Sequence, residues 1–194
     1  MRPLAELGTA GNSPMAGKRA FAAFSVLELV VVLAIGLVLT AMTVPGLYQV
    51  SVSYRVSGAA SGLAMQLALA RLSAAGQFTH AQVAADTLNQ NYAVQIWNKT
   101  TNSWATDQGG TQYLPSSVVF GYPADAPPAG SQAAIGETTP ISFDSRGMNL
   151  SSAVPSALYI QDSSGRYAYA VVASVIGKVN VYRYDFSRGQ WVRP

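Results

Sequence analysis

The stretch AFSVLELVVVLAIGLVLTAMTVP, residues 23–45, is apolar almost throughout and contains a single charged residue, Glu28. From Leu29 to Tyr48 the chain has no acidic or basic side chain. A helix of about 20 residues rises about 30 Å, which is the thickness of the hydrocarbon core of a bilayer. The stretch therefore predicts a helix that crosses a membrane and carries one carboxylate close to its start.

Basic residues predict the orientation of this helix. Lys18 and Arg19 precede the apolar stretch, and the next basic residue is Arg55, beyond it. Such a basic N-terminal flank favours a cytoplasmic N-terminus and an exported remainder. A cleaved secretory signal is one alternative, but its apolar core is shorter. A plain signal anchor fits the length but leaves Glu28 unexplained, because an acid inside an anchor is costly and usually marks a function.

The remaining composition argues against catalysis. The 194-residue chain has no cysteine, so disulfides and cysteine-based metal sites are excluded, and its only histidine is His80. The acids beyond the apolar stretch are scattered, and the chain contains no phosphate-binding loop and no G-x-S-x-G motif. We therefore expect no enzyme activity, no metal and no cofactor. A signal-anchored periplasmic enzyme is the weaker alternative.

The helical pattern continues beyond Pro45. Apolar residues recur at three- and four-residue spacing and form one stripe, which predicts an amphipathic second half of the helix over residues 49–76. Gly76 is the expected C-terminal cap. The stripe consists of Val52, Val56, Ala59, Ala60, Leu63, Leu67 and Ala70.

Residues 77–194 have the pattern of a β-rich domain. Short alternating segments separated by turn residues predict strands at 81–85, 92–97, 103–105, 117–120, 140–143, 157–160, 167–174 and 178–184. The Pro-, Gly- and Ala-rich segment 122–136 has no periodicity, so we expect a mobile or variable loop. The predicted fold is α+β, with a long N-terminal helix packed on a C-terminal antiparallel β-sheet.

Phe24, Ser25, Glu28, the apolar run to Leu39 and Pro45 together resemble the class III signal of type IV pilins and type II secretion pseudopilins. The resemblance implies a leader at residues 1–23 and a membrane-spanning, filament-core half of the helix at 24–48. It also implies that prepilin peptidase cuts between Ala23 and Phe24 and methylates the amine of Phe24. Ala23 stands where the family nearly always has glycine, and Met15 would begin a leader of more typical length than Met1.

In that family, the acid at the position of Glu28 pairs with the terminal amine of a neighbouring subunit. The resemblance therefore implies that Glu28 directs assembly and methylation, and that Pro45 kinks the helix. A buried carboxylate needs such a positive partner. The start of a helix also favours an acid through the helix dipole.

A second resemblance concerns the β-rich part. Segments 69–71, 141–148 and 171–185, with Phe143, Gly147 and Gly177, are similar to the GspH/FimT group of minor pseudopilins and minor pilins. Membership would imply a subunit of a type II secretion pseudopilus or a type IV pilus, anchored in the inner membrane with a periplasmic globular domain. Its partners would be prepilin peptidase, other pilins or pseudopilins and, through the globular domain, secreted cargo.

The C-terminal segment raises a DNA-binding alternative. Residues 166–194 interleave arginines with aromatic residues, a composition that suits phosphate contacts and base stacking. Some FimT-type minor pilins bind DNA with a basic tail, so Arg183, Arg188 and Arg193 are candidate DNA contacts. We favour the simpler interpretation of an edge hairpin with solvated arginines and packed aromatics.

Overall fold

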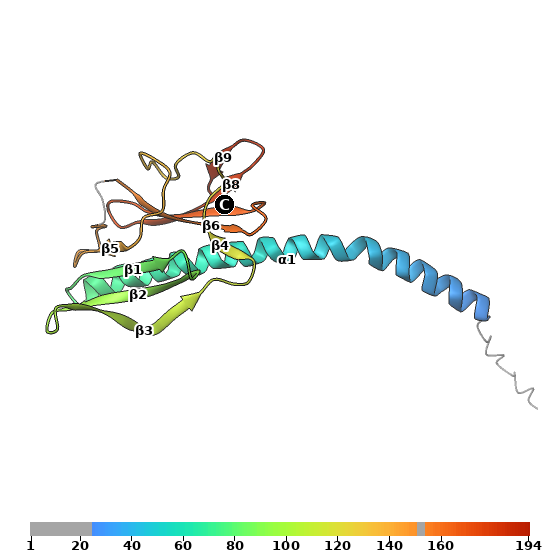
Figure 1. Ribbon diagram of the computed structural model, residues 1–194, viewed down its shortest axis with the longest axis horizontal. Coiled ribbons are helices and arrows are strands. Elements are labelled where there is room, and N and C mark those ends of the chain that lie inside the picture. The colour runs from blue at the N-terminus through green and yellow to red at the C-terminus, as the bar shows by residue number, and fades with distance from the viewer. Residues whose placement is uncertain (1–24, 151–153) are drawn as a thin grey trace, which may run out of the picture. The chain divides into compact units, whose positions relative to one another are not determined.

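The computed structural model describes residues 25–150 and 154–194 (Figure 1). The chain divides into two compact units, one ending at Val44 and the other comprising Pro45–Pro194. We call them unit 1 and unit 2 and describe each by itself. One helix, α1 (Val26–Gly76), supplies the described part of unit 1 and the first element of unit 2.

Nine strands follow α1 and form two antiparallel sheets. Sheet A has the order β3-β2-β1-β5 and contains β1 (Ala81–Asp86), β2 (Asn91–Asn98), β3 (Ser103–Tyr113) and β5 (Ile141–Phe143). Sheet B has the order β4-β6-β7-β8-β9 and contains β4 (Val118–Phe120), β6 (Ser156–Asp162), β7 (Ala168–Ala173), β8 (Val179–Asp185) and β9 (Gln190–Val192). The predicted α+β fold is confirmed, but with two sheets where the sequence suggested one.

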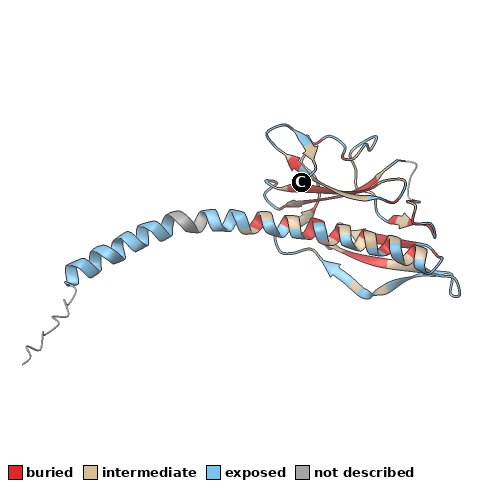
Figure 2. Cartoon of the chain, turned by 180° about the vertical axis from the view of Figure 1, so that it is seen from behind, coloured by how far each residue is buried: buried red, intermediate tan, exposed pale blue. Residues whose placement is uncertain are grey.

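The predicted stripe of α1 forms the centre of the core. All seven of its residues are buried, and Leu63 and Leu67 are completely buried. They belong to one apolar cluster with residues of sheet A, such as Val83 and Ile141, and of sheet B, such as Leu158. Figure 2 shows the buried face of α1 turned toward the strands. Both sheets therefore pack on one face of the helix, and truncating a leucine there would cost about 2–5 kcal/mol of stability.

The C-terminal cap of α1 differs from the prediction. Phe78, and not Gly76, has a left-handed backbone, with φ of 50°. Thr79 N–H donates to Ala74 O at 3.0 Å, and Phe78 N–H donates to Ala75 O at 3.3 Å, which is the Schellman pattern. Phe78 thus occupies the position at which most such motifs have glycine.

The segment predicted as a mobile loop packs on sheet B. Ala126 and Ala129 are buried, and Ala129 joins an apolar cluster with Tyr159 and Val172. Ala129 N–H also donates to the Tyr159 hydroxyl at 3.1 Å. Segment 122–136 therefore packs on the face of sheet B that does not pack on α1, and its mobility or variability stays a prediction.

Candidate assembly site

The start of α1 is built around Ser25 and Glu28. Ser25 Oγ accepts a hydrogen bond from Leu27 N–H at 3.3 Å, and Ser25 O accepts one from Leu29 N–H at 3.1 Å. Ser25 is therefore the N-cap, and Glu28 lies in the first turn, three residues later. The pair matches the S-x-x-E capping box, a signal present in the sequence that our sequence reasoning missed.

Glu28 is exposed, and no described residue forms an ion pair with it. Its place in the first turn is favourable because the positive end of the helix dipole lies there. Ala23 and Phe24, the predicted cleavage and methylation residues, lie outside the described residues. Pro45 falls within the span of α1, but its side chain is also outside the described set, so the kink stays a prediction.

The part of α1 in unit 1 is apolar on every side. The exposed fractions of its large apolar side chains up to Leu39 run from 49% at Val31 to 79% at Val26. In the part of the chain that the structure describes, α1 is the one helix long and apolar enough to cross a membrane. An all-round apolar helix needs either lipid or other helices around it.

In unit 2, α1 has a second apolar face. Tyr54, Met65 and Leu72 are 75%, 72% and 69% exposed, and Leu69 is 40% exposed. These residues lie at helical spacing on the side opposite the buried stripe. We call them the outward face of α1. Neither sheet of the same chain covers it (Figure 2).

The segments that resemble the GspH/FimT group meet at the C-terminal part of α1. Arg71 Nε donates to Gly147 O at 3.1 Å. Gly147 and Gly177 both have left-handed backbones, with φ of 75° and 77°, and a Cβ at position 177 would lie only 1.9 Å from Gly147 O. Phe143, just before this turn, is completely buried. We call Arg71, Gly147 and Gly177 the glycine junction, and it joins α1 to both sheets.

Asp144 organises the turn that leads to Gly147. Its Oδ1 accepts hydrogen bonds from Met148 N–H at 2.8 Å and Arg146 N–H at 2.9 Å, and its Oδ2 contacts Arg146 Nε at 3.0 Å. Burial acts to raise the pKa of Asp144, but these hydrogen bonds outweigh it and hold the pKa below its usual value. The residue is therefore the structural centre of this turn.

The three candidate DNA contacts do not share one surface. Arg183 is exposed on the face of β8 that also carries Val181, which packs on the α1 core. Arg193 instead lies over the ring of Tyr182, 5.7 Å from its centroid, and Tyr182 packs on the opposite face with Tyr159. Arg188 pairs with Asp185 at 3.8 Å in the β8–β9 turn.

The described residues contain no group of three or more His, Cys, Asp or Glu side chains that could hold a metal. His80 is exposed, and its carbonyl accepts a hydrogen bond from Trp97 N–H at 2.8 Å. An open groove of about 440 Å³ beside Trp97 is lined by Lys99 and Asp107 among others. The ammonium group of Lys99 already has a partner, because its Nζ donates to Phe78 O at 2.7 Å.

The sequence matches no protein-family model and no curated protein. Among solved structures, it is similar to the minor pseudopilin EpsH from the type 2 secretion system of Vibrio cholerae. The TM-score is 0.50 at 15% identity, over 66% of this chain and 95% of that chain.

Two further structures were found. A second EpsH structure from Vibrio cholerae has a TM-score of 0.48 at 13% identity, over 67% of this chain and 94% of that one. The type IV minor pilin FimU from Pseudomonas aeruginosa has a TM-score of 0.47 at 13% identity, over 66% of this chain and 88% of that one. From the similarity to the first EpsH structure, the chain has a pilin-like fold, with one long N-terminal helix packed on antiparallel sheets.

Proposed function

We propose that this protein is a minor, non-catalytic subunit of a type II secretion pseudopilus or a type IV pilus. The observation that carries the proposal is the distribution of apolar surface along α1. Within unit 1 the helix is apolar on every side, and within unit 2 no sheet covers the outward face of α1. A subunit that first resides in a membrane and then packs helix against helix in a filament would use both surfaces.

Glu28 would set the register of assembly. In the proposed filament its carboxylate pairs with the terminal amine of Phe24 in a neighbouring subunit, which compensates the charge of the buried acid. Before assembly, the apolar helix would hold the protein in the inner membrane with its N-terminus in the cytoplasm. Unit 2 would then lie in the periplasm and meet other minor subunits or secreted cargo.

Processing by prepilin peptidase tests whether the protein is a pilin or pseudopilin subunit. We expect cells that contain the peptidase to yield a mature chain that begins with N-methylated Phe24, and cells that lack it to yield the full precursor. Intact mass and N-terminal sequencing measure both. A chain that stays uncleaved in both strains, or is cut after the apolar stretch, would replace the proposal with an anchored or secreted domain.

The outward face gives an independent test. We expect Met65→Glu to fold normally, because Met65 is 72% exposed. It should nevertheless lose most of its incorporation into filaments, because the new carboxylate would be buried between helices without a partner. The measurement is the amount of variant that co-purifies with sheared filaments, with the thermal midpoint as the check on folding.

Thr101→Glu, in the exposed β2–β3 turn, introduces the same charge at a residue that is not part of the outward face and is the matched control. It should be incorporated at the parental level. If Met65→Glu is incorporated as well as Thr101→Glu, the outward face is not a packing surface.

A further inference from the structure

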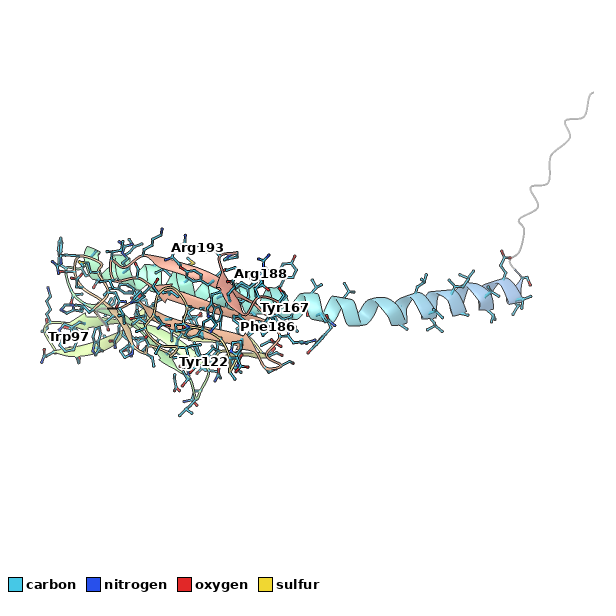
Figure 3. All side chains as sticks on the ribbon, turned by 90° about the horizontal axis from the view of Figure 1, so that it is seen from above. Trp97, Tyr122, Tyr167, Phe186, Arg188 and Arg193 are labelled. Atoms are coloured by element: carbon cyan, nitrogen blue, oxygen red, sulfur yellow. The ribbon has the colours of Figure 1, made fainter. Side chains whose placement is uncertain are left out.

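Four arginines gather at the end of unit 2 where α1 enters, and we call this surface the basic end. Arg166 and Arg183 line one open groove of about 240 Å³ together with Tyr167 and Phe186. Arg188 follows in the β8–β9 turn. Figure 3 shows Tyr167, Phe186 and Arg188 at this end, with Trp97 at the other end of the unit.

Arg55 of α1 also belongs to the basic end, because it contacts the segment just before β4. Its Nη1 lies 3.5 Å from Ser116 Oγ. The next residue, Ser117, accepts a hydrogen bond at its carbonyl from Ser163 N–H at 2.9 Å, and Ser163 belongs to the same turn as Arg166. These contacts connect Arg55 to the turn of Arg166, and the groove connects Arg166 to Arg183.

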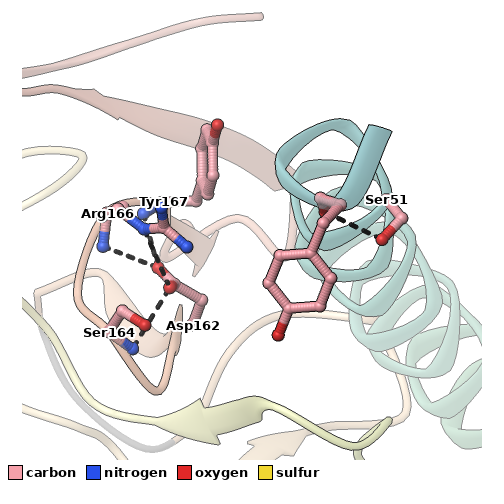
Figure 4. A network of polar contacts seen from close by, with 6 residues as sticks. Ser51, Asp162, Ser164, Arg166 and Tyr167 are labelled. Atoms are coloured by element: carbon pink, nitrogen blue, oxygen red, sulfur yellow. Dashed lines mark hydrogen bonds and ion pairs between the residues drawn. The ribbon is translucent and has the colours of Figure 1, made fainter. Parts of the chain in front are cut away.

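The acids at this end are engaged within their own turns. The Asp162 side chain is 2% exposed and accepts hydrogen bonds from the N–H groups of Ser164, Arg166 and Tyr167 (Figure 4). Its Oδ2 lies 4.0 Å from Arg166 Nε. Asp185 likewise accepts hydrogen bonds from Ser187 N–H and Oγ, which hold the pKa of Asp185 below its usual value.

The guanidinium groups remain accessible while these carboxylates are occupied. The side chains of Arg166 and Arg188 are 46% and 69% exposed, and Arg183 is exposed. Asp125, also exposed, precedes Ala126, which packs with Tyr184 on the other face of sheet B from Arg183. The basic end therefore has an excess of positive charge, because four arginines face the two carboxylates Asp162 and Asp185.

Exposed aromatic rings accompany the positive charge. Tyr48 and Tyr54 of α1 are 59% and 75% exposed, and Phe186 is 48% exposed. Tyrosine is enriched at the interface between hydrocarbon and water, and arginine can anchor a helix there. Tyr48 closes the apolar stretch, and Arg55 lies seven residues later, about 10 Å further along a helix. One headgroup layer is about 5–8 Å deep, so with Tyr48 at its inner edge Arg55 would lie at its outer edge.

We infer that the basic end docks on anionic phospholipid headgroups while α1 spans the membrane. The inference rests on the membrane-inserted state of the proposed function but not on filament assembly. Phosphate groups of the lipids would bind the four guanidinium groups, and Tyr48, Tyr54 and Phe186 would enter the headgroup layer. Docking would hold unit 2 against the membrane. Filament assembly would then have to break these contacts to remove the subunit from the bilayer.

The experiment uses the full chain in lipid nanodiscs. Because the protein has no cysteine, Ser187→Cys gives a single fluorescent label at the basic end. Asn102→Cys gives a matched label in the β2–β3 turn, close to the C-terminal end of α1. Energy transfer from each label to an acceptor on the headgroups is measured in phosphatidylcholine discs and in discs with 30% phosphatidylglycerol (about the anionic share that gives a strong surface potential).

We expect transfer from position 187 to rise in the anionic discs and transfer from position 102 to stay unchanged. Arg166→Gln, Arg183→Gln and Arg188→Gln should each shift the docking equilibrium about fivefold toward the undocked state. The melting temperature of Arg183→Gln should stay parental, because Arg183 forms no ion pair among the described residues. Equal transfer from position 187 in both disc types would overturn the inference.

Two other outcomes are separated by the same samples. If the protein fails to enter discs of either composition, the membrane-inserted state is wrong and the inference falls with it. If a short DNA duplex binds the protein in phosphatidylcholine discs through the same arginines, while anionic lipid changes nothing at position 187, the basic end binds nucleic acid instead and the inference is overturned.

Discussion

Glu28→Gln is expected to remove the protein from filaments while leaving unit 2 folded. Glutamine has the size of glutamate and can still complete the capping box with Ser25. It cannot form an ion pair with the terminal amine of Phe24 in a neighbouring subunit. Breaking one partner of a buried ion pair costs about 3–5 kcal/mol, because the other charge stays buried and uncompensated.

That cost corresponds to a loss of incorporation of about two to four orders of magnitude at equilibrium. The measurement is quantitative immunoblotting of sheared filaments against total membrane-held protein, in cells that process the chain. Glu28→Asp keeps the charge on a shorter side chain and should retain part of the incorporation. This distinguishes loss of the charge from a small change in shape.

Glu137→Gln makes the same chemical change in unit 2, far along the chain from α1, and is the control. Burial raises the pKa of Glu137, so its carboxyl group is already easier to protonate than an ordinary glutamate. We expect filament incorporation of this variant at the parental level. Parental incorporation of Glu28→Gln would contradict the pairing role and would favour a plain membrane anchor.

The sequence predicted α1 and its buried face because both depend on a repeated pattern. Val52 to Ala70 follow the helical period over several turns, and every predicted stripe residue is buried. The strands with apolar, β-branched sequences were also predicted, such as β2, β6 and β7. In each of these elements the local preference and the tertiary burial agree.

Elements that depend on their neighbours were missed. β3 extends to Tyr113 through polar residues and Gly109–Gly110, so its sequence resembles a loop, and it is a strand because it pairs with β2. β9 has three residues and is defined by its pairing with β8. The left-handed Phe78 could not be predicted, since the usual glycine signal stood two residues earlier, at Gly76.

The candidate functional residues also divide into those that the sequence identified and those whose placement it did not predict. Glu28 was identified through a resemblance, and the S-x-x-E spacing was the physical signal available in the sequence. The separation of Arg183 from Arg193 follows from strand register, because Arg183 pairs with Val192 and not with Arg193. A difference of one residue in register moves a side chain to the other face of a sheet, and the turn between β8 and β9 that sets this register was not assigned from the sequence.

Gly177→Ala is expected to destabilise unit 2 strongly. An added Cβ would lie 1.9 Å from Gly147 O, so the two backbone segments of the glycine junction would have to separate. The left-handed backbone at position 177 adds a further cost for any residue with a Cβ. Together these effects should lower the free energy of unfolding by about 3 kcal/mol or more.

Gly165→Ala separates the cost of the left-handed backbone from the cost of the clash. Gly165 also has a left-handed backbone, with φ of 67°, but a Cβ there would meet no atom within 4 Å. This variant should lose only about 1–2 kcal/mol. Urea unfolding of the full chain in nanodiscs, followed by tryptophan fluorescence, measures both losses.

The difference between the two losses reports the tightness of the glycine junction. If Gly177→Ala loses no more than Gly165→Ala, the junction is loose and the approach of Gly177 to Gly147 O does not contribute to stability. A larger loss for Gly177→Ala would instead show that contact between the two loops is what fixes both sheets on α1. Arg71→Gln, which removes the hydrogen bond to Gly147 O but keeps both glycines, should then fall between the two because it weakens the junction without adding a clash.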